Sequence, residues 1–128
     1  MSPIEELLID KKTQIERIIQ KVKGLIGIEK ETGDVNILIS LGDLSDKEKI
    51  GLFFIGKYLA FEGKLISNPT VTRNELAEKF GLDKDAISAR LSELKKEGII
   101  KSTKKSMYDI NINKMDNILN QIKKRDKK

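Results

Sequence analysis

The spacing of apolar residues changes at Gly24. Before it, isoleucine, leucine and valine recur at three- and four-residue steps, which predicts one amphipathic helix from Pro3 to about Lys23. Ser2 and Glu5 form a capping box at the start of this helix. Its apolar stripe requires a covering surface, and the sequence leaves open whether the rest of the chain or a second copy of the chain provides it.

Between residues 25 and 40 the apolar period is two, which predicts a β-hairpin whose turn uses Gly33 for a positive φ. A second capping box, formed by Ser45 and Glu48, opens a helix that is apolar almost all round its axis. Three of the four phenylalanines lie in this helix. Because such a pattern is typical of a helix buried on several sides, we expect it to be the centre of the core.

The segment after Val71 predicts two short helices, a tight turn between them and a hairpin. A third capping box, Thr72 with Glu75, opens the first helix, and Gly81 ends it. The second helix, at about 83–97, starts at a possible cap, Asp83, and Gly98 closes it. A hairpin over 99–112 follows, and helical spacing resumes from residue 113 to about residue 125.

This order of elements is that of a winged helix-turn-helix, in which the hairpin is the wing. The sequences at 71–82, 87–91 and 94–100 (VTRNELAEKFGL, ISARL and LKKEGII) resemble winged helix-turn-helix transcription regulators of archaea and bacteria. The resemblance implies a three-helix core, dimeric binding of double-stranded DNA, and a recognition helix in the major groove. Together with the patterns in the flanking segments, which match no family, the sequence predicts a mostly helical α+β fold: an extension for packing or dimerisation over 1–44, the winged domain over 45–112, and a C-terminal helix with a basic tail over 113–128.

The predicted recognition helix has one apolar face and one polar face. Its apolar residues, Ile87, Leu91 and Leu94, attach it to the core, so Lys84 and Ser88 are the best placed to read bases. Arg90 lies at the margin, where it contacts phosphate or lies along the core. The full set of candidate DNA-binding residues comprises the outward positions of this helix, one residue of the preceding helix and the wing turn: Lys84, Asp85, Ser88, Ala89, Arg90, Ser92, Arg73, Lys104, Lys105 and Ser106.

The net charge of +5 is concentrated at one end of the chain. Residues 99–128 hold 9 basic and 3 acidic side chains, whereas residues 1–98 are nearly balanced. A local basic excess is typical of polyanion binding, but it is also typical of a solubilising tail, and the wing lysines have the same two interpretations. The recognition helix itself is only weakly basic, because it carries Asp85 and Glu93 and has Ala89 where many related regulators carry arginine. A winged helix that docks on another protein, without specific DNA binding, is therefore the alternative function.

The absence of cysteine and histidine excludes disulfides, thiolate zinc sites and the common nucleophile–base pairs. Gly56-Lys57 lacks the remainder of a phosphate-binding loop. We therefore expect no enzymatic activity, metal or cofactor, although an apolar pocket for a small-molecule effector would leave no short motif. No apolar run is long enough for a membrane span, so we expect a cytoplasmic protein. We expect a homodimer whose interface contains the first helix, with the C-terminal helix around Ile118 and Ile122 as a further candidate.

Overall fold

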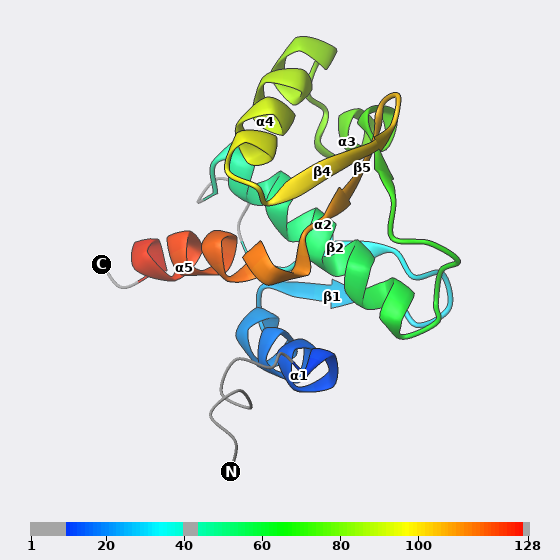
Figure 1. The fold of residues 1–128 in the computed structure, drawn as a ribbon, viewed down its shortest axis with the longest axis vertical. Helices are drawn as coiled ribbons and strands as arrows, with labels where there is room; N and C mark the ends of the chain where they lie inside the picture. The colour runs from blue at the N-terminus through cyan, green and yellow to red at the C-terminus, as the bar shows by residue number, and fades with distance from the viewer. Residues whose placement is uncertain (1–9, 40–43, 127–128) are drawn as a thin grey trace.

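The computed structural model describes residues 10–39 and 44–126, which form five α-helices and two antiparallel sheets (Figure 1). This arrangement confirms the predicted α+β winged-helix fold. No helix of the described part is long and apolar enough to cross a membrane. In chain order, the elements are α1 (Lys11–Val22), β1 (Ile26–Ile28), β2 (Val35–Ile37), α2 (Asp46–Glu62), β3 (Val71–Thr72), α3 (Arg73–Phe80), α4 (Lys84–Lys96), β4 (Ile100–Lys104), β5 (Met107–Ile110), a 3₁₀ turn (Ile112–Lys114) and α5 (Met115–Asp126).

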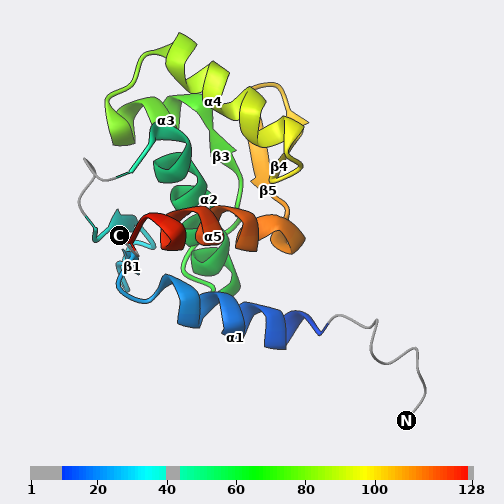
Figure 2. The ribbon, with the colours of Figure 1, turned by 90° about the vertical axis from the view of Figure 1, so that its left-hand side faces the viewer.

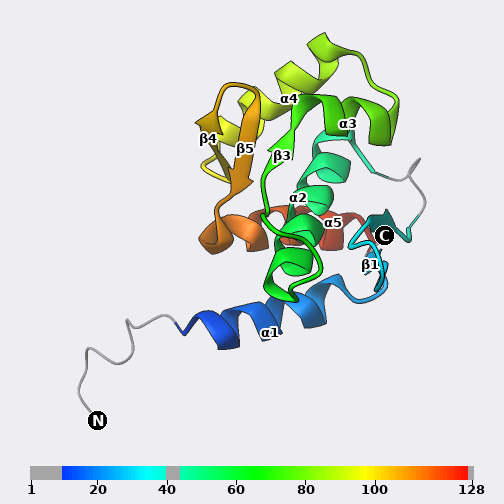
Figure 3. The same cartoon turned by 90° about the vertical axis from the view of Figure 1, so that its right-hand side faces the viewer.

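Helix α2 is the centre of the core, as its apolar pattern predicts. The capping box is present: Glu48 N donates to Ser45 Oγ at 3.1 Å, and Ser45 N donates to Glu48 Oε1 at 2.8 Å. Leu52, Phe54 and Ile55 are completely buried. The β1–β2 hairpin, α4 and α5 all contact α2. Figures 2 and 3 show α2 spanning the molecule, with α3 and α4 at one end and α1 at the other.

Two glycines let neighbouring elements approach α2 closely. A Cβ at Gly51 would lie 2.9 Å from side-chain atoms of Ile118 on α5. A Cβ at Gly56 would lie 2.4 Å from Val35 Cγ1 on β2. These distances are far below van der Waals contact, so the hairpin and α5 rest directly on the backbone of α2. Gly33 has φ +78°, which confirms its predicted role in the hairpin turn.

The helix-turn-helix also follows its local sequence signals. Thr72 and Glu75 form the predicted capping box at the start of α3. Gly81 ends α3 in the left-handed conformation with φ +66°. Asp83 caps α4 by accepting a hydrogen bond from Ala86 N at 2.8 Å, and Gly98 follows the helix with φ +77°. Each boundary therefore lies where a side chain or a positive φ satisfies the helix end.

The prediction of one helix from Pro3 to Lys23 is wrong at its N-terminal end. Helix α1 starts at Lys11, and Asp10 before it has an extended backbone. Asp10 accepts hydrogen bonds from Lys12 N at 3.1 Å and from Thr13 Oγ1 at 2.8 Å. Because a carboxylate that satisfies the free amides of a helix start favours a cap over a helix interior, the helix begins here. The predicted capping box of Ser2 and Glu5 lies outside the described residues.

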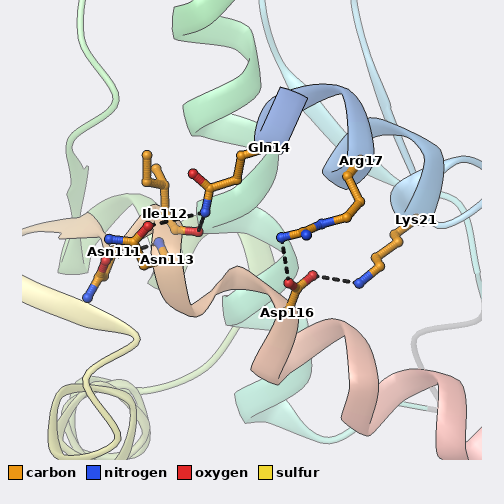
Figure 4. A network of polar contacts seen from close by, with 7 residues as sticks. All are labelled: Gln14, Arg17, Lys21, Asn111, Ile112, Asn113 and Asp116. Atoms are coloured by element: carbon orange, nitrogen blue, oxygen red, sulfur yellow. Dashed lines mark hydrogen bonds and ion pairs between the residues drawn. The ribbon is translucent and has the colours of Figure 1, made fainter. Parts of the chain in front are cut away.

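Polar contacts join α1 to α5 and to the turn before it (Figure 4). Asp116 accepts from Arg17 Nη2 at 3.1 Å and from Lys21 Nζ at 2.7 Å. Gln14 Nε2 donates to the carbonyl of Ile112 at 3.3 Å and to Asn113 Oδ1 at 3.2 Å. The apolar stripe of α1 is thus covered in part by its own chain, with Ile18 and Val22 buried.

The C-terminal end of α2 is joined to α1 as well. Lys11 Nζ lies 3.0 Å from Glu62 Oε1. Hydrogen bonds from Lys11 and from Tyr58 hold the pKa of the Glu62 carboxyl below its usual value. These contacts tie the first turn of α1 to the last turn of α2.

The expectation that α5 contributes an apolar dimer surface is wrong. Met115, Ile118, Leu119 and Ile122 are at most 1% exposed within a single chain. They pack against α2 as part of the core. Their periodicity predicted an apolar face correctly, but periodicity alone does not show which surface covers that face.

We expect Gly56→Ala to destabilise the protein by about 1–3 kcal/mol, because the new methyl group overlaps the stiff side chain of Val35. This value is the net of two opposing effects, because alanine by itself stabilises a helix interior by about 1 kcal/mol relative to glycine. Urea denaturation measures the effect. Gly63→Ala is the control, because its Cβ would lie 3.4 Å from Leu59 O, an ordinary contact. Val35→Ala should recover part of the loss in Gly56→Ala, and equal stability of Gly56→Ala and Gly63→Ala would contradict the close approach.

Candidate nucleic-acid interface

Helix α3 is anchored to the core helix by one ion pair and one aromatic contact. Lys57 of α2 pairs with Glu75, the same carboxylate that completes the capping box of α3. The Lys57 ammonium also lies 6.0 Å from the centre of the Phe53 ring. Phe53 in turn meets Phe80 of α3 edge to face, with ring centres 6.0 Å apart. Because these contacts act at both ends of α3, they fix the helix on which the interface is built.

The wing belongs to a three-stranded sheet rather than to an isolated hairpin. Strand β5 lies between β4 and β3, with Val71 opposite Tyr108 and Thr72 opposite Met107. Sequence periodicity did not predict β3, because two residues are too few to show alternation. Its pairing ties the start of α3 to the wing.

Asn111 fixes the base of the wing to the end of α4. Its backbone N–H donates to the Ile99 carbonyl at 2.7 Å, and its Nδ2 donates to the Gly98 carbonyl at 3.2 Å. Its Oδ1 accepts from Asn113 N at 3.1 Å and so caps the turn that follows. Asn111 therefore joins the end of α4, the wing and the connection to α5.

Arg73 fixes the tip of the wing. The strands are joined through a tight turn at Lys105 and Ser106, where Ser106 has φ +62°. Arg73 N donates to the Ser106 carbonyl at 3.3 Å. The Arg73 guanidinium donates from Nη2 to Ser106 Oγ at 2.5 Å and from Nη1 to Ser88 Oγ on α4 at 3.2 Å. A single side chain thus connects α3, α4 and the wing.

A cleft of about 440 Å³ opens beside this contact. Among the described residues that line it, three are cationic and none is acidic: Arg73 from α3, Lys84 from α4 and Lys105 from the wing turn. The remaining lining residues are Thr72, Asn74, Ser106 and Met107. Converging cations with hydroxyl and amide groups form the kind of site that binds a phosphate group.

The structure brings half of the candidate residues together and leaves the others along α4 and β4. Arg73, Lys84, Ser88, Lys105 and Ser106 surround the cleft or the Arg73 contact. The remaining five are placed as follows: Asp85, Ala89 and Ser92 are exposed on α4, Lys104 is exposed at the end of β4 but does not line the cleft, and Arg90 is half-buried with its Nη2 2.9 Å from Glu93 Oε1.

Sequence reasoning did not select Thr72, Asn74 and Met107, although all three line the cleft. Thr72 was identified only as a helix cap. Asn74 is exposed in the first turn of α3, a position where a helix N-terminus favours anions. Met107 lies at the cleft because it pairs with Thr72 of β3. The sequence did not reveal this pairing, because it did not predict β3.

Residues 65–101 match a family model described as winged helix-turn-helix DNA-binding. The matched residues include β3, α3, α4 and the start of β4. This match confirms the resemblance on which the predicted fold rests. No curated protein and no solved structure gave a match. In the part of the chain that the structure describes, no group of three or more acidic side chains is placed to hold a metal ion.

We expect Asn111→Ala to lower the free energy of unfolding by about 1–2 kcal/mol, because it removes the side-chain hydrogen bonds to Gly98 and Asn113. Asn117→Ala is the matched control at an exposed position of α5. Chemical denaturation of both variants measures the difference. Equal losses would show that Asn111 does not fix the base of the wing.

Proposed function

We propose that this winged helix-turn-helix module binds double-stranded DNA sequence-specifically, as a transcription regulator, with α4 in the major groove and the wing turn on the backbone. The observation that carries the proposal is the cleft in which Arg73, Lys84 and Lys105 converge beside the start of α4. The family match over 65–101 supports DNA binding by the same elements.

The exposed face of α4 suits close approach to base edges. The major groove, about 12 Å wide, admits one helix. Ala89 and Ser92 are exposed and short, so they allow the helix backbone to come near the bases. Asp85 is also exposed, and a carboxylate in the groove accepts a hydrogen bond from the amino group of cytosine. Ile87 and Leu91 are buried on the opposite face and hold α4 rigidly on the core.

The cleft suits one phosphate of the DNA backbone. Phosphate contacts fix the register of a protein on the duplex, and cations that neutralise phosphates release counterions. Because Lys84 lines the cleft together with Lys105, we assign both lysines to phosphate. Readout of bases then falls to Asp85, Ser88, Ala89 and Ser92.

We also propose a homodimer formed through the free side of α1. Ile19 is 39% exposed there and borders an apolar groove of about 270 Å³ that Ile26, Ile28 and Leu59 also line. The exposed charges along this side of α1 have both signs, as in Lys12 and Glu16, so the surface complements itself in an antiparallel pair. Since α1 lies at the opposite end of the molecule from α4, such a dimer leaves both recognition helices uncovered (Figures 2 and 3).

We expect Lys105→Ala to weaken binding to all duplexes nearly equally. The slope of log K against log salt should fall by about 0.9, the value for one lost phosphate contact, and by about 1.8 in the double variant with Lys84→Ala. Lys30→Ala, in the exposed turn between β1 and β2, is the control with the same change of charge. Fluorescence anisotropy at several salt concentrations gives the slopes.

Two results separate the alternatives. If the salt slope were unchanged in Lys105→Ala and in the double variant with Lys84→Ala, the cleft would not be a phosphate site. If the unmodified protein bound no duplex even at low salt, the protein-docking function would replace the DNA-binding one, and Asp85 on the outward face of α4 would be its first explanation.

Ile19→Glu should convert a dimer into a monomer, because it places a charge in the apolar part of the proposed interface. Leu65→Glu is the control, since Leu65 is 38% exposed in the loop after α2. Sedimentation equilibrium at tens of micromolar measures the mass of each protein. A monomeric mass for the unmodified protein would refute the proposed dimer.

A further inference from the structure

The contact between Arg73, Ser88 and Ser106 joins the recognition helix to a wing residue distant in sequence. Ser88 and Ser106 lie 15 and 33 residues from Arg73 along the chain. Both hydroxyl groups accept from the same guanidinium, and all three side chains are half-buried. A guanidinium is planar and holds its donors in fixed directions, so two hydroxyl groups bound to it are fixed relative to each other.

We propose that Arg73 is a positioning residue through which the wing tip controls how Ser88 reads DNA. On this basis Ser106 contributes to sequence preference without contacting a base itself. The inference rests on the proposed function, because it concerns the same interface, but it reverses the ordinary division in which the wing contributes affinity alone.

The hydrogen-bond chemistry of Ser88 explains how the control operates. A serine hydroxyl has one proton to donate and two lone pairs, and a hydroxyl with free rotation pairs with base donors and base acceptors alike. In this structure one lone pair of Ser88 is occupied by Arg73 Nη1. The Ser88 proton must then point away from the guanidinium, and the nearby positive charge disfavours the approach of an amino group. Ser88 is thus biased towards donation, which favours the acceptors of guanine and thymine over the amino group of cytosine in the major groove.

Ser106 maintains this arrangement by holding the other side of the guanidinium. Arg73 Nη2 donates to Ser106 Oγ, and the Arg73 backbone donates to the Ser106 carbonyl. Without the Ser106 hydroxyl, the guanidinium loses one of its two side-chain partners and is free to turn towards the cleft. The Ser88 hydroxyl then rotates freely again and pairs with base donors and base acceptors alike.

The test is selection of duplexes from a random library by the full-length protein and its variants. Ser106→Ala should reduce discrimination at one base pair by about three- to tenfold, and this base pair should be the one affected by Ser88→Ala. The Ser88→Ala/Ser106→Ala double variant should lose no more discrimination at this base pair than Ser88→Ala alone, because the two changes remove the same interaction. Ser102→Ala, which removes an exposed hydroxyl from β4 of the same hairpin, should leave the preference unchanged.

Two further variants distinguish positioning from a general loss of structure. Arg73→Lys keeps the charge but not the planar fork, so it should change base preference with little change in salt slope. Ser106→Gly removes the same hydroxyl and suits the φ of +62°, so it should reproduce the effect of Ser106→Ala even if the alanine variant folds poorly. An equal loss of affinity for all sequences in the Ser106 variants would overturn the inference and leave the wing as a phosphate contact only.

A measurement without DNA separates failure of this inference from failure of the proposed function. In the free protein, Ser106→Ala should shift the NMR signals of Ser88, whereas Ser102→Ala should not. Unshifted Ser88 signals would overturn the coupling itself. Shifted signals in a protein that selects no duplex sequence would show that the coupling exists but that sequence-specific DNA binding, and with it the role inferred here, is wrong.

Discussion

Burial of α2 on every side is the constraint on which the rest of the structure depends. Ten of its 17 residues are buried, and the β1–β2 hairpin, α4, α5 and β5 each cover part of its surface. Burial of a large apolar side chain contributes about 1.5–3 kcal/mol, whereas a glycine inside a helix costs about 1 kcal/mol. The core therefore gains more from the close contacts of Val35 and Ile118 than α2 loses by carrying Gly56 and Gly51.

The same core helix determines the geometry of the interface. Lys57 and Phe53 hold α3, and the buried face of α4 packs on α2 directly. The wing is then fixed at its base by Asn111 and at its tip by Arg73. Because contacts within the chain hold α4 and the wing in place, DNA binding of the proposed kind would cost them little conformational entropy. The cleft is formed by three separate elements, so it keeps its shape only while these contacts hold α3, α4 and the wing together.

Sequence signals predicted those parts of the fold that depend on local chemistry. Capping side chains and left-handed glycines located the start of α2 and both ends of α3 and α4, because the groups that satisfy a helix end lie within three or four residues of it. The strand β3, the burial of Ile118 and the contact of Arg73 with Ser106 depend on pairings between distant segments, so no local pattern reveals them. Asp10 is a local signal that was missed. It caps α1, but the apolar spacing continues on both sides of it and suggested one longer helix.

The distribution of charge shows why composition alone gave an incomplete picture of the interface. Within residues 99–126 the basic residues are divided between the wing and α5 (Met115–Asp126), because α5 runs away from the wing (Figure 1). The cations of the cleft come instead from segments around residues 73, 84 and 105. With Asp85 exposed on α4, the proposed interface has less sequence-independent attraction for DNA than the three cleft cations alone would give. Selectivity depends on the ratio of specific to non-specific binding, and a weak background raises that ratio only if the few base contacts are held rigidly. Fixed geometry at α4 is therefore the property on which the proposed sequence recognition depends.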